Sequence, residues 1–206
     1  VHLRLAAEYV RAGMVTEAIE QGGIAVEMAP DNVDARMLLG GIYAGLKMFE
    51  PARVQFDAVL KIKPGQTEAA IYLGALLAEE RRYEEAIKFF ESLTHNPDFA
   101  EPERAYYYIG RVRSEQGASN HLAAQKAFNK ALELRPEYPE AVMALAILLR
   151  SQEKEKEMEV LLRSYQEKYG AEREMARLLG QYYLEHEDYG RALDQLEALD
   201  GFERDN

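Results

Sequence analysis

Imidazole and carboxylate side chains are the groups in this sequence whose spacing could do metal chemistry. His186 lies in the run Glu-His-Glu-Asp at positions 185–188, and both kinds of side chain are ligands for divalent cations. A metal ion needs ligands that converge on one point, whereas four consecutive residues point around a helix end. Asp188 is better placed as the N-cap of a following helix, where its carboxylate accepts hydrogen bonds from free backbone N–H groups. We therefore expect no metal site here.

Side chains suited to covalent or acid–base catalysis are scattered along the chain. The other histidines, His2, His95 and His121, fall in different parts of the sequence. The sequence lacks the P-loop motif, the G-x-S-x-G nucleophile turn, the H-E-x-x-H zinc motif and the G-x-G-x-x-G dinucleotide motif. The absence of cysteine excludes thiolate catalysis, disulfides and cysteine-ligated zinc. We predict a protein that is not an enzyme, with no catalytic residue, cofactor or metal.

Composition and charge narrow the class of partner. The chain is 48% apolar and 30% charged, and it has no run of 18 or more apolar residues that would predict membrane insertion. Its formal charge of -11 argues against nucleic acid, because a nucleic-acid binder needs a cationic face. We interpret this charge as a source of solubility. Since the chain begins at Val1 without a leader, we expect a fragment; a cytoplasmic location is favoured and a periplasmic one stays open.

An internal repeat organises the sequence. Pro30 and Pro64 close two successive copies of one pattern, and similar residues precede each of them in register. A unit this short cannot bury its own apolar face, so it must stack on further copies. Apolar residues at i, i+3, i+4 and i+7 predict two helices in each unit, with ranges 33–46, 49–62, 67–80 and 83–94 for the second and third units. Asp31, Asn32 and Thr67 are the expected N-caps, and Pro51 and Pro102 are expected in first turns.

The repeated pattern combines a leucine with a small residue on the first helix, a small residue and an aromatic on the second, and then a proline. The second and third units show it as Leu39-Gly40, Ala52, Phe56 and Pro64, and as Leu73-Gly74, Ala86, Phe90 and Pro97. This pattern resembles the tetratricopeptide repeat (TPR). The resemblance implies an all-α, right-handed solenoid of about six helix-turn-helix units, about 12 helices, forming one domain over residues 1–206. The expected units are 1–32, 33–66, 67–98, 99–138, 139–172 and 173–206.

Three departures from the pattern are informative. Gly22 stands where the large aromatic is expected, which predicts either closer helix packing or a hollow that a neighbour fills. Two extra residues near Gly117–Asn120 lengthen the turn of the fourth unit. The segment from His95 to Pro102 could act as a hinge, but we favour a longer turn because the units on both sides keep their core positions.

The resemblance also implies a concave groove lined by the first helix of each unit. Positions around the small residue of that helix should face the groove, and in this sequence they are mainly apolar. The predicted partner-binding residues are Met37, Leu38, Gly41, Ile71, Tyr72, Ala75, Tyr107, Tyr108, Arg111, Met143, Arg150 and Arg177.

The groove residues predict the chemistry of the partner. Some TPR modules hold a peptide carboxylate with lysine and asparagine, but the matching places here carry residues such as Leu3, Met37 and Ala7. Methionine and tyrosine over a floor of small residues instead suit the apolar face of a helix or an extended segment. The alternative is that the apolar residues pack against the next unit as core. The arginines could likewise pair with nearby glutamates, which would make them weak indicators.

Two functions remain open at this stage. The first is a non-enzymatic scaffold that binds an apolar or amphipathic segment of a partner protein during complex assembly. The alternative is a homo-oligomeric adaptor that dimerises through its C-terminal end, where Leu193, Leu196 and Leu199 precede the last residues of the chain. Phe202 could fold back over that end and cover it.

Overall fold

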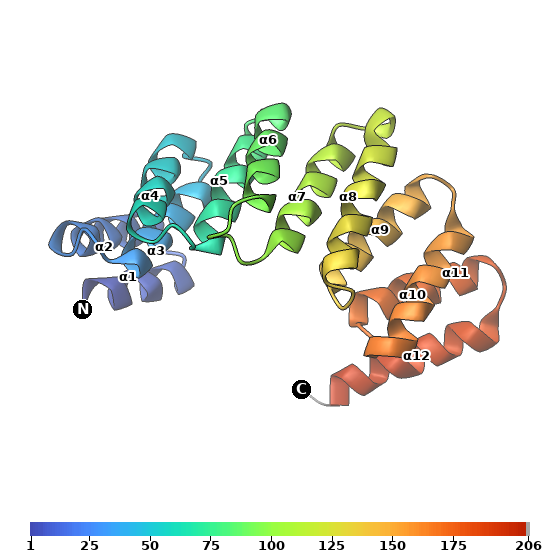
Figure 1. Cartoon of the computed structure of the whole chain (residues 1–206). Coiled ribbons are helices and arrows are strands. Elements are labelled where there is room, and N and C mark those ends of the chain that lie inside the picture. The colour runs from blue at the N-terminus through green and yellow to red at the C-terminus, as the bar shows by residue number, and fades with distance from the viewer. Residues whose placement is uncertain (205–206) are drawn as a thin grey trace. The chain divides into compact units, whose positions relative to one another are not determined.

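The computed structural model describes the backbone of residues 1–204 and the side chains of residues 1–199. These residues form twelve α-helices and one 3-10 helix, with no strand among them, which confirms the all-α fold class (Figure 1). No helix in this described part is long and apolar enough to cross a lipid bilayer. The chain divides into two compact units, residues 1–108 and 109–206, and the division falls inside α7.

The first unit contains α1 to α6 and the beginning of α7. The bounds are α1 His2–Arg11, α2 Val15–Met28, α3 Val33–Gly45, α4 Phe49–Ile62, α5 Thr67–Glu79, α6 Tyr83–Thr94 and α7 Pro102–Glu115. Helices that follow one another in sequence pack together, from α1 with α2 to α5 with α6. The four helix ranges predicted for the second and third repeats are confirmed to within one residue at each end.

Of the three expected N-caps, the structure confirms Asn32 and contradicts Asp31 and Thr67. Asn32 caps α3, because its side-chain oxygen accepts a hydrogen bond from the backbone N–H of Ala35 at 2.9 Å. Pro51 and Pro102 lie in first turns as predicted. The prediction of Thr67 as an N-cap is wrong. Gln66 precedes α5, and Thr67 is its buried first residue.

The second unit contains the end of α7 and the helices after it. The bounds are η1 Ala118–Asn120, α8 His121–Leu134, α9 Pro139–Ser151, α10 Glu155–Tyr169, α11 Arg173–Glu185 and α12 Tyr189–Arg204. The two extra residues predicted in this region accompany η1, a short turn that follows Gly117 and leads into α8. Asp188 caps α12 as predicted, because its carboxylate accepts a hydrogen bond from the backbone N–H of Arg191 at 3.2 Å.

Within a helix pair, a phenylalanine ring lies directly against the glycine of the facing helix. A β carbon added to Gly40 would lie 2.8 Å from Cε1 of Phe56, and one added to Gly110 would lie 2.5 Å from Cε1 of Phe128. Gly74 is covered by Phe90 in the same way. These distances leave no room for a side chain, so glycine is required where the two helices approach each other.

The same rings contact the next helix in the array. Tyr72 of α5 stacks on Phe56 with ring centroids 4.9 Å apart, and Tyr108 of α7 stacks on Phe90 at 5.2 Å. Phe56 and Phe90 therefore each lie between a glycine on one side and a tyrosine ring on the other. Stacked rings gain energy beyond the area that they bury, so this contact helps to join successive pairs.

Two of the irregular places in the sequence have a clear structural explanation. At Gly22, which lacks the aromatic, an added β carbon would lie 3.2 Å from Cδ1 of Leu39, so the neighbouring helix fills the space. Between α6 and α7, Phe99 is buried, and the carbonyl oxygen of Asp98 would lie 2.9 Å from a β carbon on Gly65. The segment is therefore packed against the α4–α5 turn, which supports the longer-turn interpretation.

The turns inside the helix pairs share a left-handed residue. Gly13, Lys47 and Arg81 occupy the same register position in successive repeats and have φ angles of 72°, 58° and 59°. Glu153 and Glu187 repeat this conformation in the second unit. Side chains with a β carbon are disfavoured in this region, so most of these turns carry strain that glycine at position 13 avoids.

The adjacent glycines of α3 provide a matched test of the close approach. Gly40→Ala should lower the free energy of unfolding by about 1–3 kcal/mol, because Phe56 is buried and cannot move away. Gly41→Ala should raise it by up to about 1 kcal/mol, because nothing lies within 4 Å of the added carbon and alanine favours helix. Urea unfolding measures both. Equal effects of the two substitutions would contradict the packing described here.

The left-handed turn makes a second prediction. Arg81→Gly should stabilise the protein by about 1 kcal/mol, because glycine adopts positive φ without strain. Arg81→Ala is the control, since it removes the same side chain and keeps the β carbon, and it should give no gain. Thermal unfolding of the two variants tests this, and a gain in both would show that the side chain, not the backbone, is responsible.

Candidate functional site

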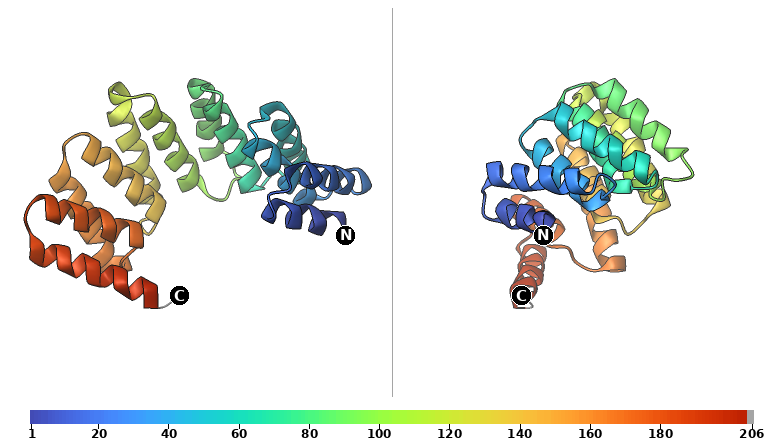
Figure 2. Two further views of the ribbon diagram at one scale, coloured as in Figure 1. Left: turned by 180° about the vertical axis from the view of Figure 1, so that it is seen from behind. Right: turned by 90° about the vertical axis from the view of Figure 1, so that its left-hand side faces the viewer.

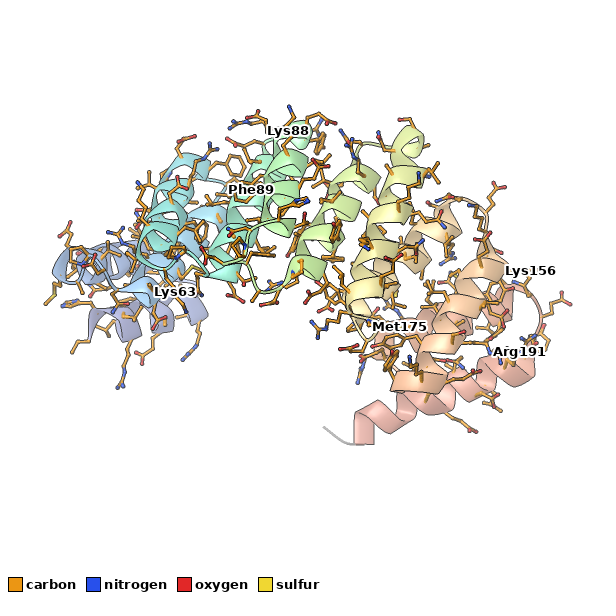
Figure 3. All side chains as sticks on the ribbon, viewed as in Figure 1. Lys63, Lys88, Phe89, Lys156, Met175 and Arg191 are labelled. Atoms are coloured by element: carbon orange, nitrogen blue, oxygen red, sulfur yellow. The ribbon has the colours of Figure 1, made fainter. Side chains whose placement is uncertain are left out.

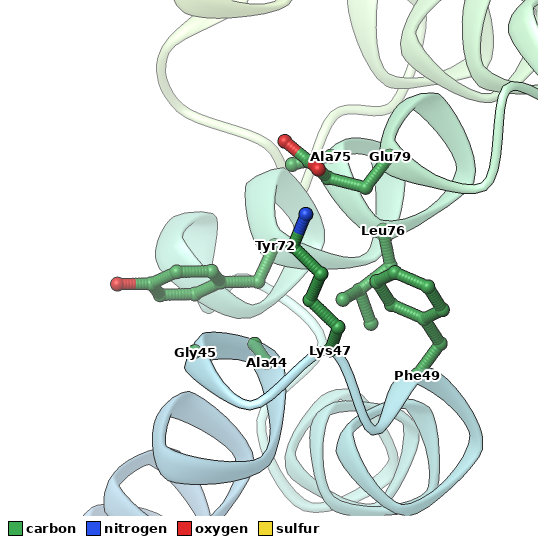
Figure 4. Close-up of a pocket in the computed structure, with 8 residues that line it drawn as sticks. All are labelled: Ala44, Gly45, Lys47, Phe49, Tyr72, Ala75, Leu76 and Glu79. Atoms are coloured by element: carbon green, nitrogen blue, oxygen red, sulfur yellow. The ribbon is translucent and has the colours of Figure 1, made fainter.

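A cleft of about 270 Å³ opens on the first unit between the end of α3, the start of α4 and the length of α5 (Figure 4). Ala44, Gly45 and Ala75 contribute small side chains or none, which leaves the space open. The cleft is lined by Ala44, Gly45, Lys47, Phe49, Tyr72, Ala75, Leu76 and Glu79. Its lining is therefore mainly apolar, with an ammonium group and a carboxylate at the surface.

The repeat itself positions these side chains. Lys47 has the left-handed conformation that ends α3 and directs the chain into α4 at Phe49. Phe49 then packs against the buried cluster that contains Phe56 and Leu76. On the opposite wall, Tyr72 is held by its stack on Phe56, although 43% of its surface stays exposed. The walls are thus parts of the core that remain partly accessible.

Lys47 and Glu79 give the cleft its polar character. Both side chains are exposed, and Figure 4 shows the Lys47 side chain running between Tyr72 and Phe49, with its ammonium end toward the side of the cleft that carries Glu79. Lysine can only donate hydrogen bonds and an ionised glutamate can only accept them. The arrangement can therefore bind an apolar side chain in the cleft while offering one donor and one acceptor to the groups beside it.

The structure separates the predicted residues of the first unit into distinct environments. Tyr72 and Ala75 line the cleft. Met37 packs against the cluster around Phe56, and Leu38 and Gly41 are half-buried. The expectation that Ile71 is exposed in a groove is wrong, because it is only 4% exposed and belongs to the core.

Tyr107 and Tyr108 combine a core role with partial exposure. Their rings meet edge to face with centroids 5.1 Å apart, and Tyr108 also stacks on Phe90. Both are half-buried. The alternative interpretation, that such residues pack against a neighbouring unit, therefore describes Tyr72 and Tyr108 in part. Direct contact of these tyrosines with a partner stays a prediction.

In the second unit, the predicted arginines pair with carboxylates. The guanidinium of Arg111 lies 3.8 Å from Glu115, that of Arg150 lies 3.2 Å from Glu185, and that of Arg177 lies 2.7 Å from Glu174. Exposed ion pairs of this kind contribute little stability. The arginines are thus surface ion pairs, and the remaining predicted residue, Met143, is half-buried.

Several surface residues escaped the sequence prediction. Lys47 comes from the turn between α3 and α4, and Phe49 is the first residue of α4; the groove pattern includes neither. Ile147 and Leu184 are 56% and 51% exposed, and they occupy the register positions of Ala75 and Ala44 in later repeats. Extending the groove register through the last three repeats would have identified both.

A polar network fixes the end of the second unit. The Tyr183 hydroxyl donates a hydrogen bond to Glu159 at 2.9 Å, and burial together with this bond raises the pKa of Tyr183 to about 12. Arg191 contacts Glu159 at 3.0 Å and also bonds Asp188, which holds the pKa of that carboxyl below its usual value. The network ties α10, α11 and α12 together.

The carboxylates near His186 make helix-end contacts. Nδ1 of His186 lies 2.9 Å from the carbonyl oxygen of Tyr182, and Nε2 lies 3.5 Å from Glu155, whereas Asp188 pairs with Arg191. Among the described residues, no three histidine, aspartate or glutamate side chains are grouped so as to hold a metal ion.

Solved structures with the same fold cover nearly the whole chain. PilW, described as a widely conserved type IV pilus biogenesis factor, matches with a TM-score of 0.70 and 21% identity over 97% of this chain and 91% of that one. PilF of Pseudomonas aeruginosa matches with a TM-score of 0.66 and 19% identity over 100% of this chain and 96% of that one. MamA from Desulfovibrio magneticus RS-1 matches with a TM-score of 0.58 and 22% identity over 81% of this chain and 92% of that one. Identities this low show the fold alone.

Sequence comparison identifies the family. No curated protein matches the chain. The family model described as tetratricopeptide repeat matches residues 3–67, 49–101 and 109–172, which together make up more than half of the sequence. The glycine, aromatic and proline register described above lies within these matches. The chain therefore belongs to the tetratricopeptide repeat family.

Proposed function

We propose that this protein is a non-enzymatic scaffold that binds an apolar or amphipathic segment of a partner protein on its first-helix groove. The cleft beside Tyr72 and Ala75 is the observation that carries the proposal. It combines an open volume, a mainly apolar lining and walls held in place by the core. Ligand sites have this character, because a preformed apolar cleft binds without the cost of ordering its own side chains.

The shape and charge of the cleft define the segment that it suits. A volume of about 270 Å³ accommodates one or two large apolar side chains rather than a whole helix. Lys47 and Glu79 can then contact polar groups on either side of that anchor. The segment is therefore one in which a leucine, methionine or aromatic residue is flanked by polar residues, in helical or extended form.

The similarity to solved structures supports the fold of this chain but does not identify the complex in which it acts. PilW is described as a pilus biogenesis factor, and assembly of a larger complex is the kind of role that we propose here. At 21% identity, the particular complex does not transfer to this chain.

Blocking the cleft tests the proposal. Peptides are selected from a random display library on the wild-type protein, and their dissociation constants are measured by fluorescence anisotropy. Ala75→Leu should weaken their binding about tenfold or more, because the added side chain occupies the cleft. Lys88→Leu is the matched control, since it adds leucine on α6 at an exposed site (Figure 3). If Ala75→Leu binds as tightly as wild type, the cleft is not the site.

Self-assembly through the C-terminal end remains an alternative with a separate test. An α12–α12 contact would bring Asp194 and Glu197 of two copies together, and like charges oppose such a contact. We therefore expect a monomer across a dilution series measured by light scattering. A mass that rises with concentration would support the homo-oligomeric adaptor instead.

A further inference from the structure

Helix α12 presents an apolar stripe that the described side chains of its own unit leave exposed. Tyr189, Leu193 and Leu196 follow the helical spacing i, i+4 and i+7, so they lie on one side of the helix. Their surfaces are 67%, 55% and 50% exposed. Ala192, which borders the stripe next to Leu196, is buried, and α12 packs against α11 (Figure 2). The side chain of Phe202, which was expected as a cover, lies outside the described residues.

The repeat register shows what such a position normally contacts. Leu196 follows Gly180 at the same interval at which Phe56 follows Gly40 and Phe90 follows Gly74. Phe56 and Phe90 are fully buried, and a tyrosine from the first helix of the next repeat stacks on each. Leu196 is thus exposed at the position where earlier repeats receive another helix.

The first helix of the chain is built differently. Glu8 lies two residues after Ala6. The equivalent residue of the second repeat, Ile42, is half-buried, and those of the third to sixth repeats are buried: Leu76, Val112, Leu148 and Tyr182. Arg4, Glu8 and Arg11 are all exposed on α1. Charged side chains therefore solvate the outer side of the first helix, whereas α12 keeps apolar side chains on its stripe.

Charge indicates the kind of helix that would cover the stripe. Glu197 borders the stripe by helical position, Asp194 follows it around the helix, and both are exposed. A second copy of α12 would oppose these carboxylates with its own. Helix α1 of a second copy would offer arginines to these carboxylates. It would also bring the carboxylate of Glu8, and it has no apolar stripe to pack on Leu193 and Leu196.

We infer that the exposed stripe of α12 is a second docking face, which binds an amphipathic helix of another protein whose apolar side is flanked by lysine or arginine. Arg191, through Glu159 and Asp188, and the 3.1 Å hydrogen bond between Gln166 and Gln195 hold α12 in place before binding. A fixed face reduces the entropic cost of association.

Two synthetic peptides of about 20 residues test this inference, a length that lets an isolated helix form. They share one leucine stripe and differ only in flanking lysines or flanking glutamates. The wild-type protein should bind the lysine peptide more tightly. Leu193→Gln/Leu196→Gln should weaken that binding about tenfold or more. Val160→Gln, which changes an equally exposed apolar residue on α10, should leave it unchanged.

Charge reversal provides the second arm. Asp194→Lys/Glu197→Lys should lower affinity for the lysine peptide and raise it for the glutamate peptide, with the difference shrinking as salt is added. Equal affinities of wild type for the two peptides, or binding of neither, would overturn the inference. Concentration-dependent dimers that Leu193→Gln/Leu196→Gln abolishes would assign the face to a second copy instead.

Binding at the cleft and binding at the α12 stripe can be tested independently. Ala75→Leu should bind the lysine peptide as wild type does, because its substitution lies in the first unit. The α12 variants should keep their affinity for those library peptides whose binding Ala75→Leu weakens. Thermal unfolding checks that each variant is folded. The α12 substitutions change exposed residues, and Ala75 is half-buried beside open space.

Discussion

The contact between a glycine and a buried phenylalanine ring is the constraint on which the rest of the structure depends. At Gly40, Gly74 and Gly110, the ring of the facing helix lies where a β carbon would stand. Close approach of the backbones buries the ring completely, and burial of a large aromatic is a major source of stability in a short repeat. A unit of two helices could not retain this ring without a neighbour to cover its other side.

That neighbour also creates the candidate site. Because Tyr72 stacks on Phe56, the tyrosine has one face in the core and another surface toward solvent. The small residues Ala44 and Ala75 then leave a cleft beside it. Packing and recognition thus share the same side chains, and residues expected to bind a partner prove to have a structural role as well. At Leu196 the register of the covered ring continues, but the side chain is exposed.

The sequence predicted the helices well because their ends are set by a strict spacing. Thr67 shows the limit of local preference, since it occupies the register position of Val33, the first residue of α3, and the register outweighs its tendency to cap. Ile71 shares the register of Met37 but is buried, because register gives the direction of a side chain and not the neighbours that cover it. Tyr72 and Ala75 were predicted, but the rest of the cleft was not, because Lys47 belongs to a turn and Phe49 begins the second helix of the pair. The pairing of Arg150 with Glu185 depends on long side chains from two helices, which spacing alone does not determine.

Another repeat of the same chain shows how the central contact can be tested. In the fifth repeat the equivalent pair is Ala146 and Leu162, and both are fully buried. Leucine, which is smaller than phenylalanine, thus occurs together with alanine, which is larger than glycine. The most direct measurement is the free energy of unfolding of Gly74→Ala, Phe90→Leu and the double variant. If the ring requires the glycine, Gly74→Ala should cost much less in the Phe90→Leu background than in the wild type, giving a coupling of about 1 kcal/mol or more. Additive effects would contradict the account.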